Sequence, residues 1–198
     1  MKRIIALSLA GAVGALCATA YADNAAPSDA PSVYVAPMIQ YSLQDNDPQI
    51  KDNFGYDAAI DYKAGQLAES LKENCPRGID VYFDNTSGAI TDAVLPQLAV
   101  GARIVICGTA SISSWNPPPN GPRVERHILV KRARMSGFLA FDYQHRYEEA
   151  IARLAAWVRD GRIRYREEIV DGIESCPSAI AELYRGENLG KRLIRLAL

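Results

Sequence analysis

Two apolar runs, each followed by small and polar residues, most constrain the fold of this chain. The first lies at residues 78–88 (GIDVYFDNTSG) and the second at residues 102–108 (ARIVICG). Short apolar runs bounded by turn residues are typical of strands that are buried on both faces of a parallel sheet. The polar residues after them would lie at the carboxyl edge of that sheet, where open α/β sheets bind ligands. The runs therefore predict an α/β fold with a candidate nucleotide site.

Strands and helices alternate from residue 56 onward, as parallel βαβ units require. We expect strands at residues 57–62, 79–83, 103–107 and 136–141, and helices at 65–74, 89–100 and 147–160. Pro96 should kink or shorten the second of these helices. Between them we expect a long loop at 109–123 and a helix or extended turn at 127–134. The remainder is expected to be extended at 162–170, helical at 177–185 and a strand at 191–196.

Size and charge exclude some classes of function. The 198 residues suffice for one ordinary domain, and 48% hydrophobic with 23% charged residues is typical of a globular protein. The net charge of -1 argues against a nucleic-acid-binding surface, so no nucleic acid is expected as a partner.

The cysteines and histidines predict neither a disulfide framework nor a metal site. The four cysteines are not spaced as a CxxC pair, and the two histidines have no metal-ligand spacing to each other or to a cysteine. We therefore expect no metal, and a reducing compartment is the simplest expectation for residues 56–198.

The N-terminus has the three regions of a secretory signal peptide. Met1-Lys-Arg is positively charged, residues 4–20 are apolar, and Ala20-Tyr-Ala22 fits a cleavage site. We interpret residues 1–22 as a signal peptide, which implies export to the periplasm or envelope. A membrane anchor or a core helix is the alternative, although the stretch is short for a spanning helix.

Gly11-Ala-Val-Gly14 resembles the turn of a nucleotide-binding loop, but its context argues against that reading. A phosphate loop follows a strand and opens a helix, so that free N–H groups meet the pyrophosphate. Here the glycines lie within the apparent leader, and Pro27, Pro31 and Pro37 follow where a helix and a strand would be expected.

Residues 23–55 form a separate, polar and proline-bearing region that we expect to be poorly ordered. Residues 23–32 are typical of a linker, and residues 33–42 alternate roughly as a strand that Pro37 interrupts. Residues 1–55 together resemble the start of an OmpA-like outer-membrane protein precursor. A single such strand cannot close a barrel, because a barrel needs about eight or more.

The later motifs resemble a second, well-defined family. In order along the chain they are DAAIDYK, GIDVYFDNTSG, ARIVICGTAS, GPRVERHILVKRARMSGFLAFDY and GENLGK. They resemble the zinc-independent branch of the medium-chain dehydrogenase/reductase superfamily, in its NADP-dependent enone, alkenal and prostaglandin reductase group. The resemblance covers about residues 55–198. It implies that residues 56–198 are a partial NADP-binding domain, an incomplete Rossmann-type parallel sheet with flanking helices, without the family's substrate domain and glycine loop.

The resemblance also implies which residues contact NADP(H). Tyr62 matches a tyrosine near the adenosine 2′-phosphate, Asn85 an asparagine beside the cofactor, and Asn188 a late asparagine that reaches it. The nicotinamide half would be lined by two segments of the chain: Cys107, Gly108, Thr109, Ala110 and Ser111, and Phe138, Leu139 and Ala140.

Two departures from the family pattern concern the same site. The loop after Cys107 reaches Trp115 where the family has a tyrosine, and an indole cannot donate a phenolic hydrogen bond. The lysine that pairs with the 2′-phosphate in the family has no counterpart here, so the preference for NADP is implied by the resemblance alone.

The reaction implied by the resemblance is hydride transfer from NADPH to the β-carbon of an α,β-unsaturated carbonyl, a small enone or alkenal. No catalytic residue is assigned. We expect this chain alone to bind NADP(H) weakly, and to dimerise through an edge strand at 137–141, as the family does. The family is cytoplasmic, whereas the leader implies export, so the compartment is left open.

Two alternatives remain open beside a reductase. The chain could be an exported envelope protein. It could also be a composite without activity, formed by a fusion or sequence join near residues 54–57, where the sequence pattern changes. A sequencing read across the codons for residues 45–65 that showed two separate genes would establish such a join.

Overall fold

The computed structural model describes residues 3–8, 33–38, 56–62, 65–112, 114–185, 188 and 190–196. Its strands are β1 (Arg3–Ser8), β2 (Val33–Met38), β3 (Ala58–Ile60), β4 (Ile79–Asp84), β5 (Leu98–Ile106), β6 (Arg134–Gly137), β7 (Glu167–Asp171) and β8 (Lys191–Arg195). Its α-helices are α3 (Leu67–Asn74), α4 (Gly88–Val94), α5 (Val124–Lys131), α6 (Tyr147–Arg159) and α7 (Cys176–Arg185).

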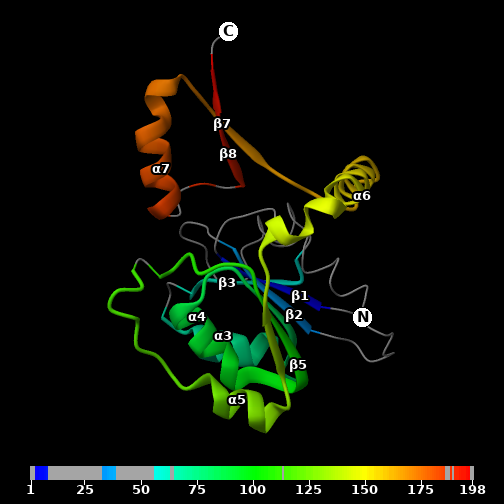
Figure 1. Cartoon of the computed structure of the whole chain (residues 1–198), viewed down its shortest axis with the longest axis vertical. Helices are drawn as coiled ribbons and strands as arrows, with labels where there is room; N and C mark the ends of the chain where they lie inside the picture. The colour runs from blue at the N-terminus through cyan, green and yellow to red at the C-terminus, as the bar shows by residue number, and fades with distance from the viewer. Residues whose placement is uncertain are drawn as a thin grey trace.

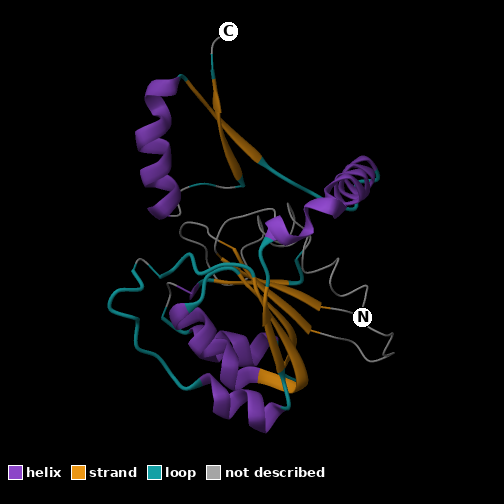
Figure 2. Ribbon diagram, viewed as in Figure 1, coloured by secondary structure: helices purple, strands orange, loops and turns teal. Residues whose placement is uncertain are grey.

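Six of these strands form one parallel sheet, in the order β3-β1-β2-β4-β5-β6. Helices α3, α4 and α5 pack against one face of it (Figures 1 and 2). Side chains alternate between the two faces of a strand, so neighbours in sequence enter different cores. Tyr82 and Ile104 are buried under these helices, whereas Phe83 and Val105 are buried on the opposite face. The predicted α/β class is confirmed.

A second, two-stranded sheet follows in the chain. β7 and β8 pair in parallel, with α7 as the connection between them. This unit lies at the top of the view in Figure 1, away from the six-stranded sheet. The extended segment, helix and strand expected over residues 162–196 are confirmed.

Two expected elements differ from the structure. The helix expected at 89–100 ends at Val94, a 3-10 turn covers Leu95–Gln97, and β5 begins at Leu98. Pro96 has no N–H to continue the helix, and its effect is stronger than the expected kink. The strand expected at 136–141 lies at Arg134–Gly137 instead, and a 3-10 segment begins at Ala140.

The N-terminal region also differs from expectation. We expected residues 1–22 and 23–55 to stand outside the α/β unit, yet β1 and β2 are strands of its sheet and pair along their whole length. Pro37 is accommodated because β2 pairs with β4 only at Tyr34 and Val35, so the ladder between these two strands ends before the proline, which has no N–H to donate. The linker at 23–32 and residues 39–55 lie outside the described residues.

The strand order carries a further difference. Dinucleotide-binding sheets have the order 3-2-1-4-5-6, in which strand 1 borders strand 4 and leads into the glycine-rich turn. Here β1 and β2 exchange places, so that β2 borders β4. A strand does precede Gly11, which corrects one premise of the sequence argument, but it is not the strand beside β4. No glycine occurs between Met38 and Gly55, in the segment that follows β2.

Candidate functional site

The carboxyl end of β4 is organised around the fully buried Asp84. Its Oδ1 accepts hydrogen bonds from the backbone N–H of Thr86 (2.9 Å) and Ser87 (2.8 Å), and from the Thr86 hydroxyl (3.3 Å). Its Oδ2 accepts one from the Thr91 hydroxyl (2.6 Å), in the first turns of α4. The carboxyl group thus fixes the turn between β4 and α4, as short acidic side chains do at helix starts.

Tyr82 extends this network into the core. Its hydroxyl lies 3.1 Å from the Thr91 hydroxyl, which donates to Asp84 and so is left to accept from Tyr82. Burial, and next the nearby Asp84 carboxyl, raise the pKa of Tyr82 well above its usual range. The phenol therefore stays a hydrogen-bond donor, and the strand end is held by polar groups that all have partners.

The end of β5 is bonded directly to this turn. The N–H groups of Cys107 (2.7 Å) and Gly108 (3.2 Å) donate to the Asp84 carbonyl oxygen. Further along, Ala110 N–H donates to the Asn85 carbonyl (3.2 Å), and Ser111 N–H to that of Thr86 (2.9 Å). The Ser111 hydroxyl adds bonds to two carbonyl oxygens of the turn, at 2.8 and 3.0 Å. Segments 84–87 and 107–111 therefore form one hydrogen-bonded unit.

Two positions in this unit are glycine because a neighbouring side chain lies too close to the backbone for a Cβ. A Cβ on Gly108 would lie 2.4 Å from Asn85 Oδ1 and 3.1 Å from the Asn85 carbonyl oxygen. A Cβ on Gly88, whose φ is +64°, would lie 2.6 Å from the Ser111 hydroxyl. Hence the Asn85 amide rests over the Gly108 backbone, at the edge where a ligand would meet both.

Gly108→Ala should weaken cofactor binding while the fold remains. The added methyl group overlaps Asn85 Oδ1 and must displace that flexible side chain from the edge. We expect a loss of about tenfold in NADPH affinity, the effect of about one lost hydrogen bond. Circular dichroism and an NADPH titration measure the two properties.

Gly137→Ala is the matched control, since its Cβ meets nothing closer than Ile106 O at 3.8 Å. Equal affinity losses in both variants would contradict the assignment of Asn85 and Gly108 to the site.

Aromatic side chains lie at the carboxyl edge of the sheet, next to the end of β6. Phe138 is half-buried, and its ring lies 6.4 Å from that of Phe83 and 6.0 Å, edge-on, from that of Tyr143. Leu139 is 61% exposed and Ala140 is also exposed. The Phe138 N–H donates to Ile106 O (3.2 Å), which ties this segment to the end of β5. Trp115 is 58% exposed on the loop after β5.

The structure brings most of the expected contact residues to one edge, but not all. Asn85, segment 107–111 and Phe138 lie at the ends of adjacent strands. Tyr62 follows β3, at the far end of the strand order, and packs against the core; burial, and next the charge of Asp61, raise its pKa. Asn188 lies beside β8, and its amide donates to Gly190 O (2.7 Å). Sequence reasoning missed Asp84 and Thr91, although Asp-Asn-Thr-Ser before a helix is a recognisable cap-like signal.

Within the described ranges, Cys75, Cys107 and Cys176 form no disulfide, and no group of three or more histidine, cysteine or acidic side chains could hold a metal ion. None of the helices described there is both long and apolar enough to cross a membrane.

Comparison with known proteins identifies the family. The family profile described as zinc-binding dehydrogenase matches residues 42–156, more than half of the chain. The chain belongs to the zinc-binding dehydrogenase family. Within this family it is 42% identical over 148 residues to the NADPH-dependent curcumin reductase of Escherichia coli, covering 72% of this chain and 43% of that protein. It is 37% identical over 150 residues to the NADP(+)-dependent 2-alkenal reductase of Nicotiana tabacum, covering 75% and 43%.

A solved structure matches the fold of this chain as well. CurA from Vibrio vulnificus, in complex with NADPH, is 34% identical, with a TM-score of 0.79 over 100% of this chain and 57% of that chain. This chain spans less than half the length of the two curated relatives named above.

Proposed function

We propose that this chain carries the cofactor-domain part of an NADPH-dependent reductase of α,β-unsaturated carbonyls. The observation that carries the proposal is the hydrogen-bonded carboxyl edge around Asn85 and Gly108, in a chain whose relatives are reductases named for NADP(H). Bound NADPH would supply a hydride, and the substrate would be a small enone or alkenal. We further propose that it needs no zinc, as in the reductase group that its motifs resemble.

The residues present fit a nicotinamide nucleotide. Gly108 has no Cβ, so the Asn85 amide can lie against its backbone at the carboxyl edge of the sheet, where the amide could contact a nucleotide. Asn188 is buried, and its Oδ1 has no partner among the described residues, which suits a donor group of a ligand. Phe138 would border the edge, with Leu139 and Ala140 exposed beside it. These residues would orient the cofactor, while Tyr62 is proposed for the adenosine end.

Weak binding of NADPH by this chain is our first prediction for this function. The strand beside β4 is β2, and no glycine follows it for sixteen residues, so a pyrophosphate loop of the usual kind is missing there. Losing about 3 kcal/mol of such contacts weakens binding about 100-fold, so we expect a dissociation constant above about 100 µM. Titration of the 198-residue chain, followed by nicotinamide fluorescence, measures it, and low-micromolar affinity would contradict the prediction.

The edge strand expected at 137–141 for a homodimer lies at Arg134–Gly137 instead, so we propose that the homodimer forms through this strand, β6, which is the last in the sheet order and so one of its edges. An exposed edge strand presents unpaired N–H and C=O groups that a second copy can use. Size-exclusion chromatography at high micromolar concentration should give the mass of a dimer, and a monomer there would exclude it.

Export is the second candidate function, supported by the leader-like residues 1–22. Cleavage after Ala22 would remove β1, which lies between β2 and β3 in the sheet. Export and this fold therefore exclude each other in a single mature chain. N-terminal sequencing decides between them: an intact Met1 supports the reductase, and a chain that begins at Asp23 supports the envelope protein.

A further inference from the structure

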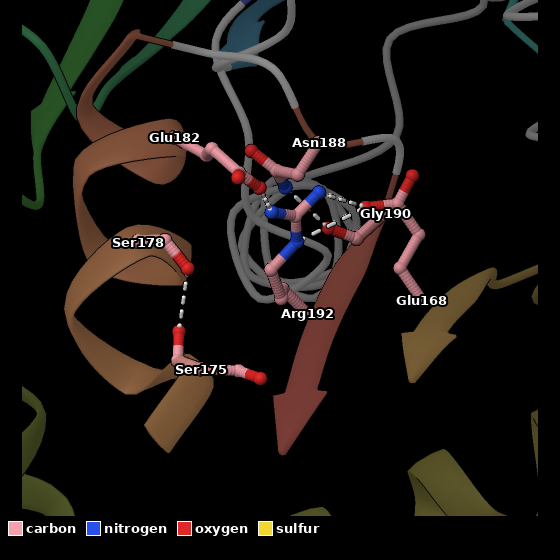
Figure 3. Close-up of polar contacts among 7 residues, drawn as sticks. All are labelled: Glu168, Ser175, Ser178, Glu182, Asn188, Gly190 and Arg192. Carbon is pink, nitrogen blue, oxygen red and sulfur yellow. Dashed lines mark hydrogen bonds and ion pairs between the residues drawn. The ribbon is translucent and has the colours of Figure 1, made fainter. Parts of the chain in front are cut away.

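Asn188 is a buried amide with one end unused. The residue is only 2% exposed, and its Nδ2 donates a hydrogen bond to Gly190 O at 2.7 Å (Figure 3). Because a carbonyl oxygen can only accept, this bond establishes which end of the amide is nitrogen. Oδ1 has no partner among the described residues. A buried acceptor left in this state is unfavourable, and a donor group of a ligand would supply the missing hydrogen bond.

The chain beside Asn188 is held by a close backbone contact. Gly190 has φ +93°, and a Cβ there would lie 2.2 Å from Arg166 O. The next N–H, that of Lys191, donates to the same oxygen at 2.8 Å. Gly190 therefore lets β8 begin directly against the residue that precedes β7, and Asn188 is bonded to this fixed point.

Arg192 joins the three elements around this segment. Its Nε and one terminal nitrogen donate to Glu168 on β7, at 3.2 and 2.8 Å, and its other terminal nitrogen donates to Glu182 on α7 (Figure 3). The Arg192 side chain is only 13% exposed. α7 ends at Arg185 and β8 begins at Lys191, so the pair between Glu182 and Arg192 links the two elements that precede and follow Asn188 in the chain.

We infer that Arg192 is a positioning residue for cofactor binding, which holds Asn188 so that its Oδ1 can accept a hydrogen bond from NADP(H). This inference rests on the proposed function. An amide oxygen carries no proton, so the ligand group that it meets must donate. A ribose hydroxyl or the carboxamide NH₂ of nicotinamide satisfies this requirement, whereas a phosphate oxygen does not.

Hydrogen exchange of the Asn188 side-chain amide tests the positioning without any ligand. Arg192→Met removes the fork that spans two carboxylates, and we expect the Asn188 NH₂ signal to exchange at least about tenfold faster, as local opening becomes easier. Arg195→Met is the matched control, since Arg195 lies on the same strand in an exposed pair with Asp171 (3.3 Å). Glu182→Gln, which keeps the pair with Glu168, should give an intermediate rate if Arg192→Met does not fold. An unchanged rate in Arg192→Met or Glu182→Gln overturns the inference.

NADPH affinity, measured by NMR titration that reaches the millimolar range, tests the link to the cofactor. Arg192→Met should weaken NADPH binding about tenfold, and the same change made in Asn188→Ala should have no further effect, because coupled residues are not additive. Arg192→Lys keeps the positive charge and should recover part of the NADPH affinity. The recovery should be incomplete, because an ammonium group cannot bridge both carboxylates as the guanidinium does. If Arg192→Met lowers NADPH affinity by the same factor in the unaltered chain and in Asn188→Ala, the inference is overturned. If the unaltered chain binds no NADPH, the proposed function fails, and the exchange rates still decide whether Arg192 holds Asn188.

Discussion

Asp84→Ala should lower the free energy of unfolding by about 3–5 kcal/mol, because two backbone N–H groups and two hydroxyls lose a buried acceptor at once. Each orphaned donor costs about 1–3 kcal/mol when no water replaces the lost acceptor. The β4–α4 turn also carries Asn85, so NADPH affinity should fall with stability. Urea unfolding followed by circular dichroism measures the first effect.

Asp84→Asn keeps the size of the side chain and most of its hydrogen bonds, and removes only the possible carboxylate charge. Its amide oxygen can still accept from the Thr86 and Ser87 N–H groups, and its NH₂ can donate to the Thr91 hydroxyl, which accepts as well as donates. We expect it to lose less than half as much stability as the alanine variant. Equal losses would show that the carboxylate charge, rather than the acceptor pattern, stabilises the turn.

Alkaline pH should destabilise the fold in a defined window. Burial raises the pKa of the Cys75 thiol from 9.0 to about 12, and that of Tyr56 from 10.0 to about 12. Below pH 9 both groups are neutral in the folded and the unfolded chain, and stability is independent of them. As pH rises from 9 toward 12, the unfolded chain loses these protons first, so stability falls by up to about 1.4 kcal/mol per pH unit for each group.

Cys75→Ala and Tyr56→Phe assign this fall to its sources. Neither replacement side chain ionises, so each variant should show a flatter decline above pH 9 or pH 10 respectively, whatever its stability at neutral pH. Urea midpoints measured in steps from neutral to alkaline pH give the slopes. A decline of unchanged steepness in both variants would place the titrating groups elsewhere.

Periodicity predicted the α/β part of the chain well, because buried strands and amphipathic helices have distinct spacings. The strand at 79–84 and the helix at 147–159 are examples in which local pattern and tertiary packing agree. The helix expected at 89–100 failed after Val94, where Pro96 and the pairing of Leu98 with Ile79 favoured a strand. Pairing with a distant strand is not visible in local propensity.

A strand was expected within residues 33–42 and is present as β2, but neither β1 nor the place of both strands in the main sheet could be predicted, for a related reason. An apolar leader and a central parallel strand have the same composition, and only the strands that flank β1 distinguish them. At the candidate site, the residues named through family motifs lie mostly at one edge, but the groups that hold them do not follow from motifs. Asp84, Thr91 and Arg192 act through partners 2 to 24 residues away, and such pairings emerge only from the folded arrangement.

The bonding between segments 84–87 and 107–111 has a thermodynamic consequence for a ligand. Four backbone N–H groups of the second segment are already committed to carbonyl oxygens of the first, so this side of the edge does not have to become ordered when a ligand arrives. The conformational entropy has been lost during folding rather than during binding. The NADPH affinity of this chain should therefore depend little on ordering of segments 84–87 and 107–111. It should depend on how well the shape and polar groups of the nucleotide match a surface that is already rigid before binding.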